Sequence, residues 1–201
     1  MKTADMRKIR RAMEKTQDEM RYEHTLGVAY TAAALAMRYG ASVENAQLAG
    51  LLHDCAKYMS GEELIRYCEK HDIEISESER ETPHLLHAKA GAYMAGHHYD
   101  IKDEDIISAI RWHTTGKPEM TLLEKIVFVA DYIEPLRDKA AHLPEIRYMA
   151  FKNIDECIFM ILKDTLDYLG KNTESIDDTT KIAYDYYRQI HENTIRRNLF
   201  D

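Results

Sequence analysis

The chain has 201 residues, 45% of them hydrophobic, and a formal net charge of −8 at pH 7. This length fits one domain with a substantial core. The acidic balance argues against non-specific binding to nucleic acid or to a membrane surface, because both require a basic face. It does not exclude an anionic small-molecule substrate, since a bound metal ion can be the largest local charge in a site.

Cysteine usage and the N-terminus indicate the compartment. Cys55, Cys68 and Cys157 are widely spaced and form no Cys-x-x-Cys pair, which is typical of a reducing environment. The first fifteen residues are charged and lack the apolar region of a signal peptide. No apolar run approaches the ~20 residues of a membrane helix. We therefore expect a cytoplasmic protein.

The hydrophobic periodicity is helical along the chain, and we find no credible pair of strands, so we expect an all-α fold. Gly40 is predicted to end a helix as a left-handed C-cap. Capping boxes at Ser60 and Thr121 are predicted to begin two others. The predicted helices cover residues 1–19, 21–39, 43–53, 61–71, 83–98, 104–113, 122–134, a short stretch from Pro144, 153–169 (ended by Gly170) and 180–197. Residues 72–82 are predicted as a loop, and the last helix is predicted to dock by Ile182, Tyr186 and Ile190.

Side chains of metal-ligand type lie beside core-forming sequence at six positions. Burying an imidazole and a carboxylate at the end of an apolar helix is costly unless something satisfies them. For His53 and Asp54 the alternative is a hydrogen-bonded core histidine beside a capping aspartate. Imidazole and carboxylate ligands without cysteine favour Fe, Mn, Mg or catalytic Zn over a structural zinc, and separate helices imply a site inside a bundle. The candidates are His24, His53, Asp54, His87, His113 and Asp131.

Asp131 is the most informative of these candidates. It lies within an apolar segment that includes Val127, Ala130 and Ile133. A lone carboxylate there would either raise its pKa or find a cation. A metal ion is one such cation, and an arginine partner is the alternative.

The order of these residues along the chain resembles the ligand pattern of a known superfamily. His24, the His53-Asp54 doublet and Asp131 on successive helices resemble the HD-domain superfamily of metal-dependent phosphohydrolases. Flanking segments resemble more narrowly its bacterial YqeK group, whose members are symmetrical dinucleoside tetraphosphate hydrolases. The segments are RYEHTLGV (21–28), LLHA (85–88), AIRWHTTG (109–116), MTLLEKI (120–126) and VADYIEP (129–135).

The resemblance covers roughly residues 20–190 and implies an HD-domain helical bundle with additional C-terminal helices. The whole chain, 1–201, would form a single domain. Residues 1–19 would be an N-terminal helical extension, residues from about 20 to 136 the HD metal-binding core, and those from about 144 to 197 C-terminal helices that pack on the core. These amphipathic C-terminal helices fit either core packing or a homodimer face.

The resemblance also implies a reaction and a metal. Iron, or Mn, Mg or Zn in its place, as one or two ions, would be held by His24, His53, Asp54 and Asp131. Water activated by the metal would split diadenosine tetraphosphate at its middle bridge, giving two ADP, with a GDP-like product from a guanosine substrate. Asp54 would bind the metal and orient the water. His87 and His113 would bind a second ion or contact phosphate, and either could protonate the departing phosphate.

Phosphate ligands are expected close to these residues. Lys57 follows Asp54, Arg21 precedes His24 and Arg137 follows Pro135, so each could place a positive charge on the polyphosphate. The loop after His113 adds the hydroxyls of Thr114 and Thr115. Base or ribose contacts would be expected at Lys171, Asn172 and Thr173, but Asp177-Asp178 stands where the family often has His-Pro, so no nucleoside contact is carried over from the resemblance.

Three alternative functions remain open from the sequence. An HD hydrolase could act on a cyclic dinucleotide, a guanosine alarmone or a nucleoside phosphate, and the reaction products would distinguish these. A non-catalytic nucleotide-binding regulator would be expected to lack one of the metal-ligating residues. An all-helical interaction protein would be expected to purify without metal. None of the six candidate ligands is missing from this chain.

Overall fold

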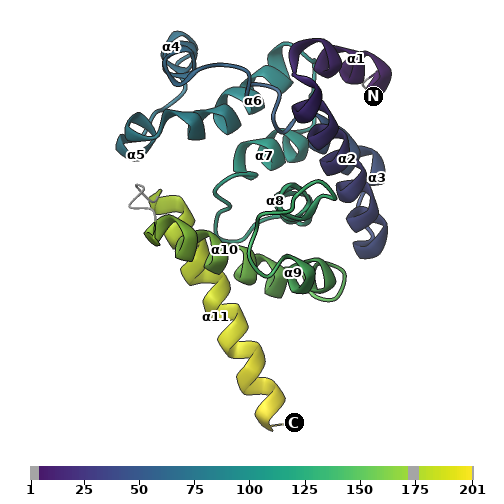
Figure 1. The fold of residues 1–201 in the computed structure, drawn as a ribbon, viewed down its shortest axis with the longest axis vertical. Coiled ribbons are helices and arrows are strands. Elements are labelled where there is room, and N and C mark those ends of the chain that lie inside the picture. Colours follow the sequence, from purple (N-terminus) through teal and green to yellow (C-terminus); the bar gives the residue numbers. More distant parts are fainter. Residues whose placement is uncertain (1–4, 172–176, 201) are drawn as a thin grey trace.

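The computed structural model describes residues 5–171 and 177–200, and they form helices joined by short loops (Figure 1). No β-strand occurs among the described residues, and the predicted all-α fold is confirmed. The helices are α1 (Met6–Thr16), α2 (Glu19–Tyr39), α3 (Val43–Leu52), α4 (Gly61–Lys70), α5 (Glu77–Glu81), the 3-10 turn η1 (Pro83–Leu85), α6 (Leu86–His97), α7 (Glu104–Trp112), α8 (Leu122–Ile133), α9 (Leu143–Ala150), α10 (Ile154–Lys171) and α11 (Asp178–Phe200).

The helix boundaries follow local capping chemistry. Ser60 and Thr121 each accept the backbone N–H of the residue three positions later, and the glutamate at that position bonds back to the cap, as the capping boxes predict. Gly40 ends α2 with φ 73°, a conformation that a glycine adopts without steric cost. Local sequence therefore accounts for where α2 ends and where α4 and α8 begin.

Three details of the predicted elements were wrong. The supposed loop 72–82 contains α5, which begins at a further capping box formed by Ser76 and Glu79. Helix α10 continues through Gly170 to Lys171, and Gly170 does not have a positive φ. Ile182 is 56% exposed and does not dock, whereas Tyr186 and Ile190 pack on the second hydrophobic cluster as predicted, beside the fully buried Tyr187.

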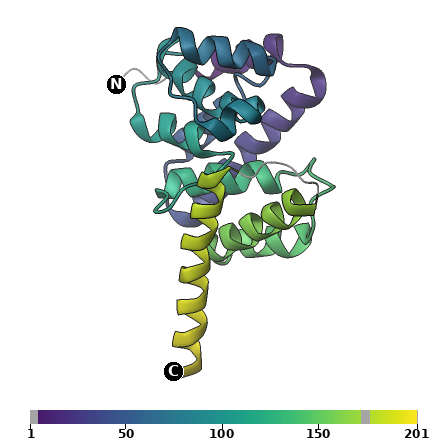
Figure 2. The ribbon, with the colours of Figure 1, turned by 90° about the vertical axis from the view of Figure 1, so that its left-hand side faces the viewer.

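The interior consists of two hydrophobic clusters. The first is built mainly from α1, α3, α4, α6 and α7, and the second from α2, α8, α9, α10 and α11. Helices α2, α3, α7 and α8 pack against one another where the two hydrophobic clusters meet. In both ribbon views the C-terminal part of α11 extends away from the rest of the molecule (Figures 1 and 2). None of the described helices is long and apolar enough to cross a membrane.

One glycine sets how closely two of these central helices approach. A Cβ placed on Gly50 of α3 would lie 2.8 Å from the Cα atom of Ala29 in α2, closer than real Cβ atoms come. Only glycine therefore allows the α2 and α3 backbones to meet at this distance. The close approach brings the His53 ring, just past the end of α3, within 5.3 Å of the His24 ring, measured between centroids.

Candidate metal centre

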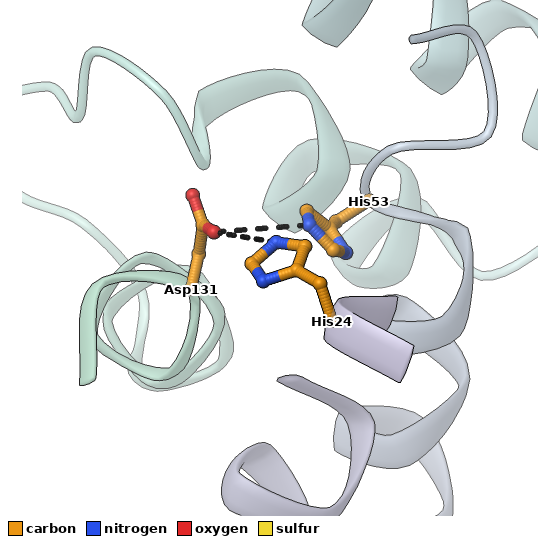
Figure 3. A group of neighbouring side chains, drawn as sticks. All are labelled: His24, His53 and Asp131. Atoms are coloured by element: carbon orange, nitrogen blue, oxygen red, sulfur yellow. Dashed lines mark ion pairs between the residues drawn. The ribbon is translucent and has the colours of Figure 1, made fainter. Parts of the chain in front are cut away.

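Residues distant in sequence meet where α2, α3, α7 and α8 pack together. His24 lies on α2, His53 and Asp54 follow α3, and Asp131 lies on α8. Figure 3 shows His24 and His53 pointing toward the same Asp131 oxygen. The Nε2 atoms of His24 and His53 lie 3.1 and 3.9 Å from Asp131 Oδ1.

Two further imidazoles complete this group through Asp54. His87 lies in the first turn of α6 and His113 directly follows α7. Their Nε2 atoms lie 3.2 and 3.6 Å from Asp54 Oδ1. All six candidate ligands predicted from the sequence are therefore brought together.

The donor atoms fall into two overlapping groups of metal-binding size. One group joins His24, His53 and Asp131, and the other joins His53, Asp54 and His113; within each, the ligand atoms lie within 4.8 Å of one another. His53 belongs to both groups. The arrangement offers mixed nitrogen and oxygen ligands, the donor set of catalytic rather than structural metal sites.

Three of the histidines are oriented by the same local contact. The Nδ1 atoms of His53 and His113 each lie 2.7 Å from the carbonyl oxygen three residues earlier, and Nδ1 of His87 lies 2.5 Å from the equivalent carbonyl. A carbonyl oxygen only accepts, so Nδ1 carries the hydrogen and Nε2 keeps a free lone pair. This is how proteins usually fix imidazoles that bind metal through Nε2.

His53 Nε2 provides the clearest test of whether a metal fits. The atom is fully buried and has no hydrogen-bond partner, which is unfavourable for a polar group. Burial lowers the pKa of His53 to about 4, so the ring is neutral near pH 7. A buried neutral nitrogen with its lone pair directed at two carboxylates has the properties required of a metal ligand, and a divalent cation fits here.

The carboxylates carry the matching negative charge. Burial alone would raise the pKa of Asp54, but His53, His113, His87 and Lys57 outweigh it and hold that pKa well below its usual value. For Asp131 the hydrogen bond from His24 and the charges of His53 and Arg137 likewise outweigh burial and lower the pKa. Both groups are therefore ionised at neutral pH.

Basic and hydroxyl side chains surround the centre. Arg21 Nη1 lies 2.7 Å from Asp54 Oδ2, and Arg137 Nη2 lies 2.8 Å from Asp131 Oδ1. The arginine partner considered for Asp131 is therefore present, together with His24. Lys57 Nζ lies 3.1 Å from His87 Nε2.

The two threonines of the loop after α7 differ. Thr114 Oγ1 lies 3.1 Å from His113 Nε2 and 3.3 Å from His87 Nε2. Thr115 Oγ1 donates to the carbonyl of Gly116 within its own loop. Asn172 and Thr173 lie outside the described residues, as does the side chain of Lys171.

Sequence reasoning missed two residues that support the centre. Glu134 is 1% exposed, and its Oε1 lies 3.0 Å from His24 Nδ1. Its position in the quoted VADYIEP segment, at the end of an apolar helix, was a usable signal. Arg147 of α9 donates to the carbonyl oxygens of Ile133, Glu134 and Arg137; nothing in its local sequence indicated this.

Comparison with protein families agrees with this geometry. The HD domain model matches residues 21–136, a span that contains all six candidate ligands. The chain belongs to the HD-domain family. The resemblance inferred from the sequence motifs is thereby confirmed.

Relatives of this HD-domain protein extend along most of its length. Three of them are named symmetrical bis(5'-nucleosyl)-tetraphosphatase, including those from Bacillus subtilis and Halalkalibacterium halodurans. The one from Bacillus subtilis is 38% identical over 168 residues, covering 84% of this chain and 89% of the relative. The one from Halalkalibacterium halodurans is 42% identical over 170 residues, covering 83% and 88%.

A solved structure is also similar to this HD-domain protein. It is a Clostridium acetobutylicum protein described as a "predicted HD superfamily hydrolase involved in NAD metabolism". The TM-score is 0.88 at 37% identity, with 91% of this chain and 96% of that chain covered. The HD-domain helical bundle expected from the sequence is therefore confirmed.

Proposed function

We propose that this HD-domain protein hydrolyses diadenosine tetraphosphate symmetrically and releases two ADP. The observation that carries the proposal is the convergence of His24, His53, Asp54 and Asp131 around the unpaired Nε2 atom of His53. The names of the relatives from Bacillus subtilis and Halalkalibacterium halodurans support the substrate class.

In this proposal the four residues His24, His53, Asp54 and Asp131 hold the catalytic ion. Iron is our first choice, with Mn, Mg or Zn as alternatives, since imidazole and carboxylate ligands suit all four metals. When bound, the ion supplies Lewis acidity and lowers the pKa of water from 15.7 toward about 7. The second group of donors, which adds His113, supports a centre that takes one or two ions.

Asp54 is suited to orient the attacking water. Its Oδ2 is anchored by Arg21, and its Oδ1 faces His87 and His113. A carboxylate fixed at one oxygen holds the other in a defined direction. Such positioning contributes much of the catalysis in phosphoryl transfer, where the protein performs little covalent chemistry.

Proton donation to the departing phosphate falls to His113 rather than His87. Burial lowers the pKa of His87 to about 4. At neutral pH His87 therefore has no proton to donate from Nε2, which suits a metal ligand or a hydrogen-bond acceptor for Lys57. In this proposal His113, when no ion occupies its Nε2, donates from that atom as the doubly protonated ring while Nδ1 stays on the Ile110 carbonyl; its Nε2 lies 3.1 Å from the Thr114 hydroxyl.

The polyphosphate would bind the basic groups at the edge of the centre. Lys57 and Arg137 have side chains 30% and 47% exposed, so both are open to an incoming anion. Arg21 (33% exposed), Thr114 and Thr115 complete the proposed phosphate ligands. The three free, buried cysteines fit a reducing environment, and we place the reaction in the cytoplasm.

The proposal is tested by metal analysis combined with product chromatography. Purified protein is analysed for Fe, Mn, Zn and Mg, then incubated with diadenosine tetraphosphate before and after removal of metal by a chelator. We expect ADP as the sole product, loss of activity on chelation, and recovery on adding back Fe²⁺ or Mn²⁺. Cyclic dinucleotides, a guanosine tetraphosphate, nucleoside monophosphates and NAD are assayed in parallel; faster turnover of any of these, or release of AMP with ATP, would contradict the proposal.

A further inference from the structure

His24 differs from the other three histidines in how its Nδ1 atom is held. His53, His87 and His113 each use the carbonyl three residues earlier, close to a helix end. His24 lies inside α2, where backbone carbonyls are committed to the helix itself. Its Nδ1 therefore needs a partner from elsewhere in the fold, and that partner is Glu134 Oε1 at 3.0 Å.

Glu134 is itself fixed in place. It caps the end of α8, and its Oε2 accepts a hydrogen bond of 2.7 Å from the backbone N–H of Leu136. One carboxylate thus accepts from two donors, one on each oxygen, while only 1% of its side chain is exposed. Carboxylates accept at both oxygens, whereas an amide of the same shape accepts at only one.

The sequence of α2 leaves space for this carboxylate. A Cβ on Gly27 would lie 2.5 Å from Glu134 Oε2 and 3.3 Å from its Cδ atom. Any side chain at position 27 would displace the carboxylate from its two donors. Gly27 lies one helical turn after His24, so the same turn of α2 supplies both the imidazole and the space for the carboxylate that holds it.

We propose that Glu134 is a positioning residue for the metal centre. Its carboxylate orients the His24 ring through Nδ1 so that Nε2 faces the ion, and the absence of a side chain at Gly27 leaves the space that the carboxylate occupies. The inference rests on the proposed ligand role of His24. A carboxylate behind a ligating imidazole fixes its ring orientation and tautomer and increases its basicity toward the metal. Glu134 itself contacts neither substrate nor ion in this proposal.

The test measures Mn²⁺ affinity on metal-free protein, following free Mn²⁺ by electron paramagnetic resonance. Glu134→Gln keeps the shape but provides one acceptor for two donors, and Gly27→Ala displaces the carboxylate without changing any charged group. We expect each to weaken Mn²⁺ binding by about 10–100-fold, the usual range for such supporting groups. We also expect kcat to recover largely at saturating Mn²⁺.

Controls separate this inference from the proposed function and from simple loss of stability. Gly170→Ala, in α10 with nothing within 4 Å of the new Cβ, should leave Mn²⁺ affinity unchanged. His24→Ala should lose affinity strongly. Unchanged affinity in both folded variants, Glu134→Gln and Gly27→Ala, with loss in His24→Ala overturns the positioning role alone. Unchanged affinity in His24→Ala overturns the ligand set and this inference with it.

Circular dichroism and the thermal midpoint report folding for each variant. If Glu134→Gln does not fold, Gly27→Ala decides the question by itself. A lowered midpoint with normal Mn²⁺ affinity means that Glu134 only stabilises the fold, and it overturns the proposal.

Discussion

Arg21 donates a hydrogen bond of 2.7 Å from Nη1 to Asp54 Oδ2, joining residues 33 positions apart. The carboxylate is only 4% exposed, and the guanidinium covers its outer oxygen. Oδ1 is thereby left to face the imidazoles of His87 and His113. Asp54 is thus held with Oδ1 toward His87 and His113 and with Oδ2 between Arg21 and His53, whose Nε2 lies 3.7 Å away.

Removing the negative charge of Asp54 should abolish turnover. Asp54→Asn keeps the shape of the side chain but replaces an anionic ligand by a neutral amide. We expect kcat on diadenosine tetraphosphate to fall at least about 100-fold, the scale of losing one electrostatic group in an active site, while the far-UV circular dichroism persists. Asp100→Asn is a matched control, since Asp100 is 86% exposed and paired only with Lys102 among the ion pairs of the described residues. Retained activity in Asp54→Asn would refute its assignment.

Lys57 is the second group whose role can be isolated. Its ammonium lies 3.8 Å from Asp54 Oδ1 and 3.1 Å from His87 Nε2, with 30% of the side chain exposed. A hydrogen bond to a charged group contributes about 1.5–3 kcal/mol, so Lys57→Ala should raise KM about 10-fold or more and change kcat less. Steady-state kinetics check this, with Lys102→Ala as the exposed control. An unchanged KM would argue against phosphate binding by Lys57.

The buried imidazoles should make the metal-free protein sensitive to acid. Burial lowers the pKa of His53 and His87 from 6.5 to about 4. Between those pH values the unfolded chain binds protons that the folded chain does not. The contribution of His53 and His87 to the free energy of unfolding is therefore complete above pH 6.5 and is lost as the pH falls toward 4. The depressed pKa values of Asp54 and Asp131 add a further loss only below about pH 4, where the unfolded carboxylates become protonated.

His24 acts in the opposite direction. Burial would lower its pKa, but Asp131 and Glu134 raise it above 6.5, so its contribution is complete below 6.5 and declines at higher pH. Because the His24 contribution is already complete below pH 6.5, the two lowered groups predict a net loss of stability from pH 6.5 to 4.5, by up to about 1.4 kcal/mol per pH unit for each of them. Urea unfolding across this range measures the slope. His87→Gln should reduce it, and an identical slope in that variant would contradict the prediction.

The candidate ligands were predictable because each is a polar residue next to apolar helical sequence. Burying such groups is unfavourable without a partner, and this alone marked His53, Asp54 and Asp131 as unusual. The order of the motifs then indicated the family. Capping residues fixed the helix ends for the same local reason: Ser60 and Thr121 act on the backbone three residues away, so no tertiary information is needed.

The supporting contacts were not predictable, since they join distant parts of the chain. Glu134 reaches back 110 positions to His24; its position at the end of an apolar helix singles it out, but nothing local indicates this partner. The exposure of Ile182 was not predictable for a related reason. Ala183, Tyr186, Tyr187 and Ile190 of α11 pack on the second hydrophobic cluster, and only that packing decides that Ile182 stays exposed.

Arg147 should couple the stability of the fold to the geometry of the centre. Its guanidinium lies 2.9, 2.7 and 2.9 Å from the carbonyl oxygens of Ile133, Glu134 and Arg137. These three residues end α8 and form the turn that carries both the His24 partner and a proposed phosphate ligand. Removing the side chain takes this donor from the part-buried carbonyls of Ile133 and Glu134, of which the second keeps the backbone N–H of Arg137. The cost is about 1–3 kcal/mol for a carbonyl left unsatisfied.

We therefore expect Arg147→Ala to lower the free energy of unfolding by about 1–3 kcal/mol and to reduce kcat/KM on diadenosine tetraphosphate. Arg147→Lys should restore only part of either loss, because a single ammonium cannot reproduce the planar fork that spans three carbonyls. Urea unfolding and steady-state kinetics provide the two measurements. Arg188→Ala is the matched control, since Arg188 on α11 pairs only with Asp185 among the ion pairs of residues 5–171 and 177–200. Lowered stability with unchanged kcat/KM would show that the turn keeps its shape without Arg147. It would contradict the prediction that Arg147 supports the metal centre.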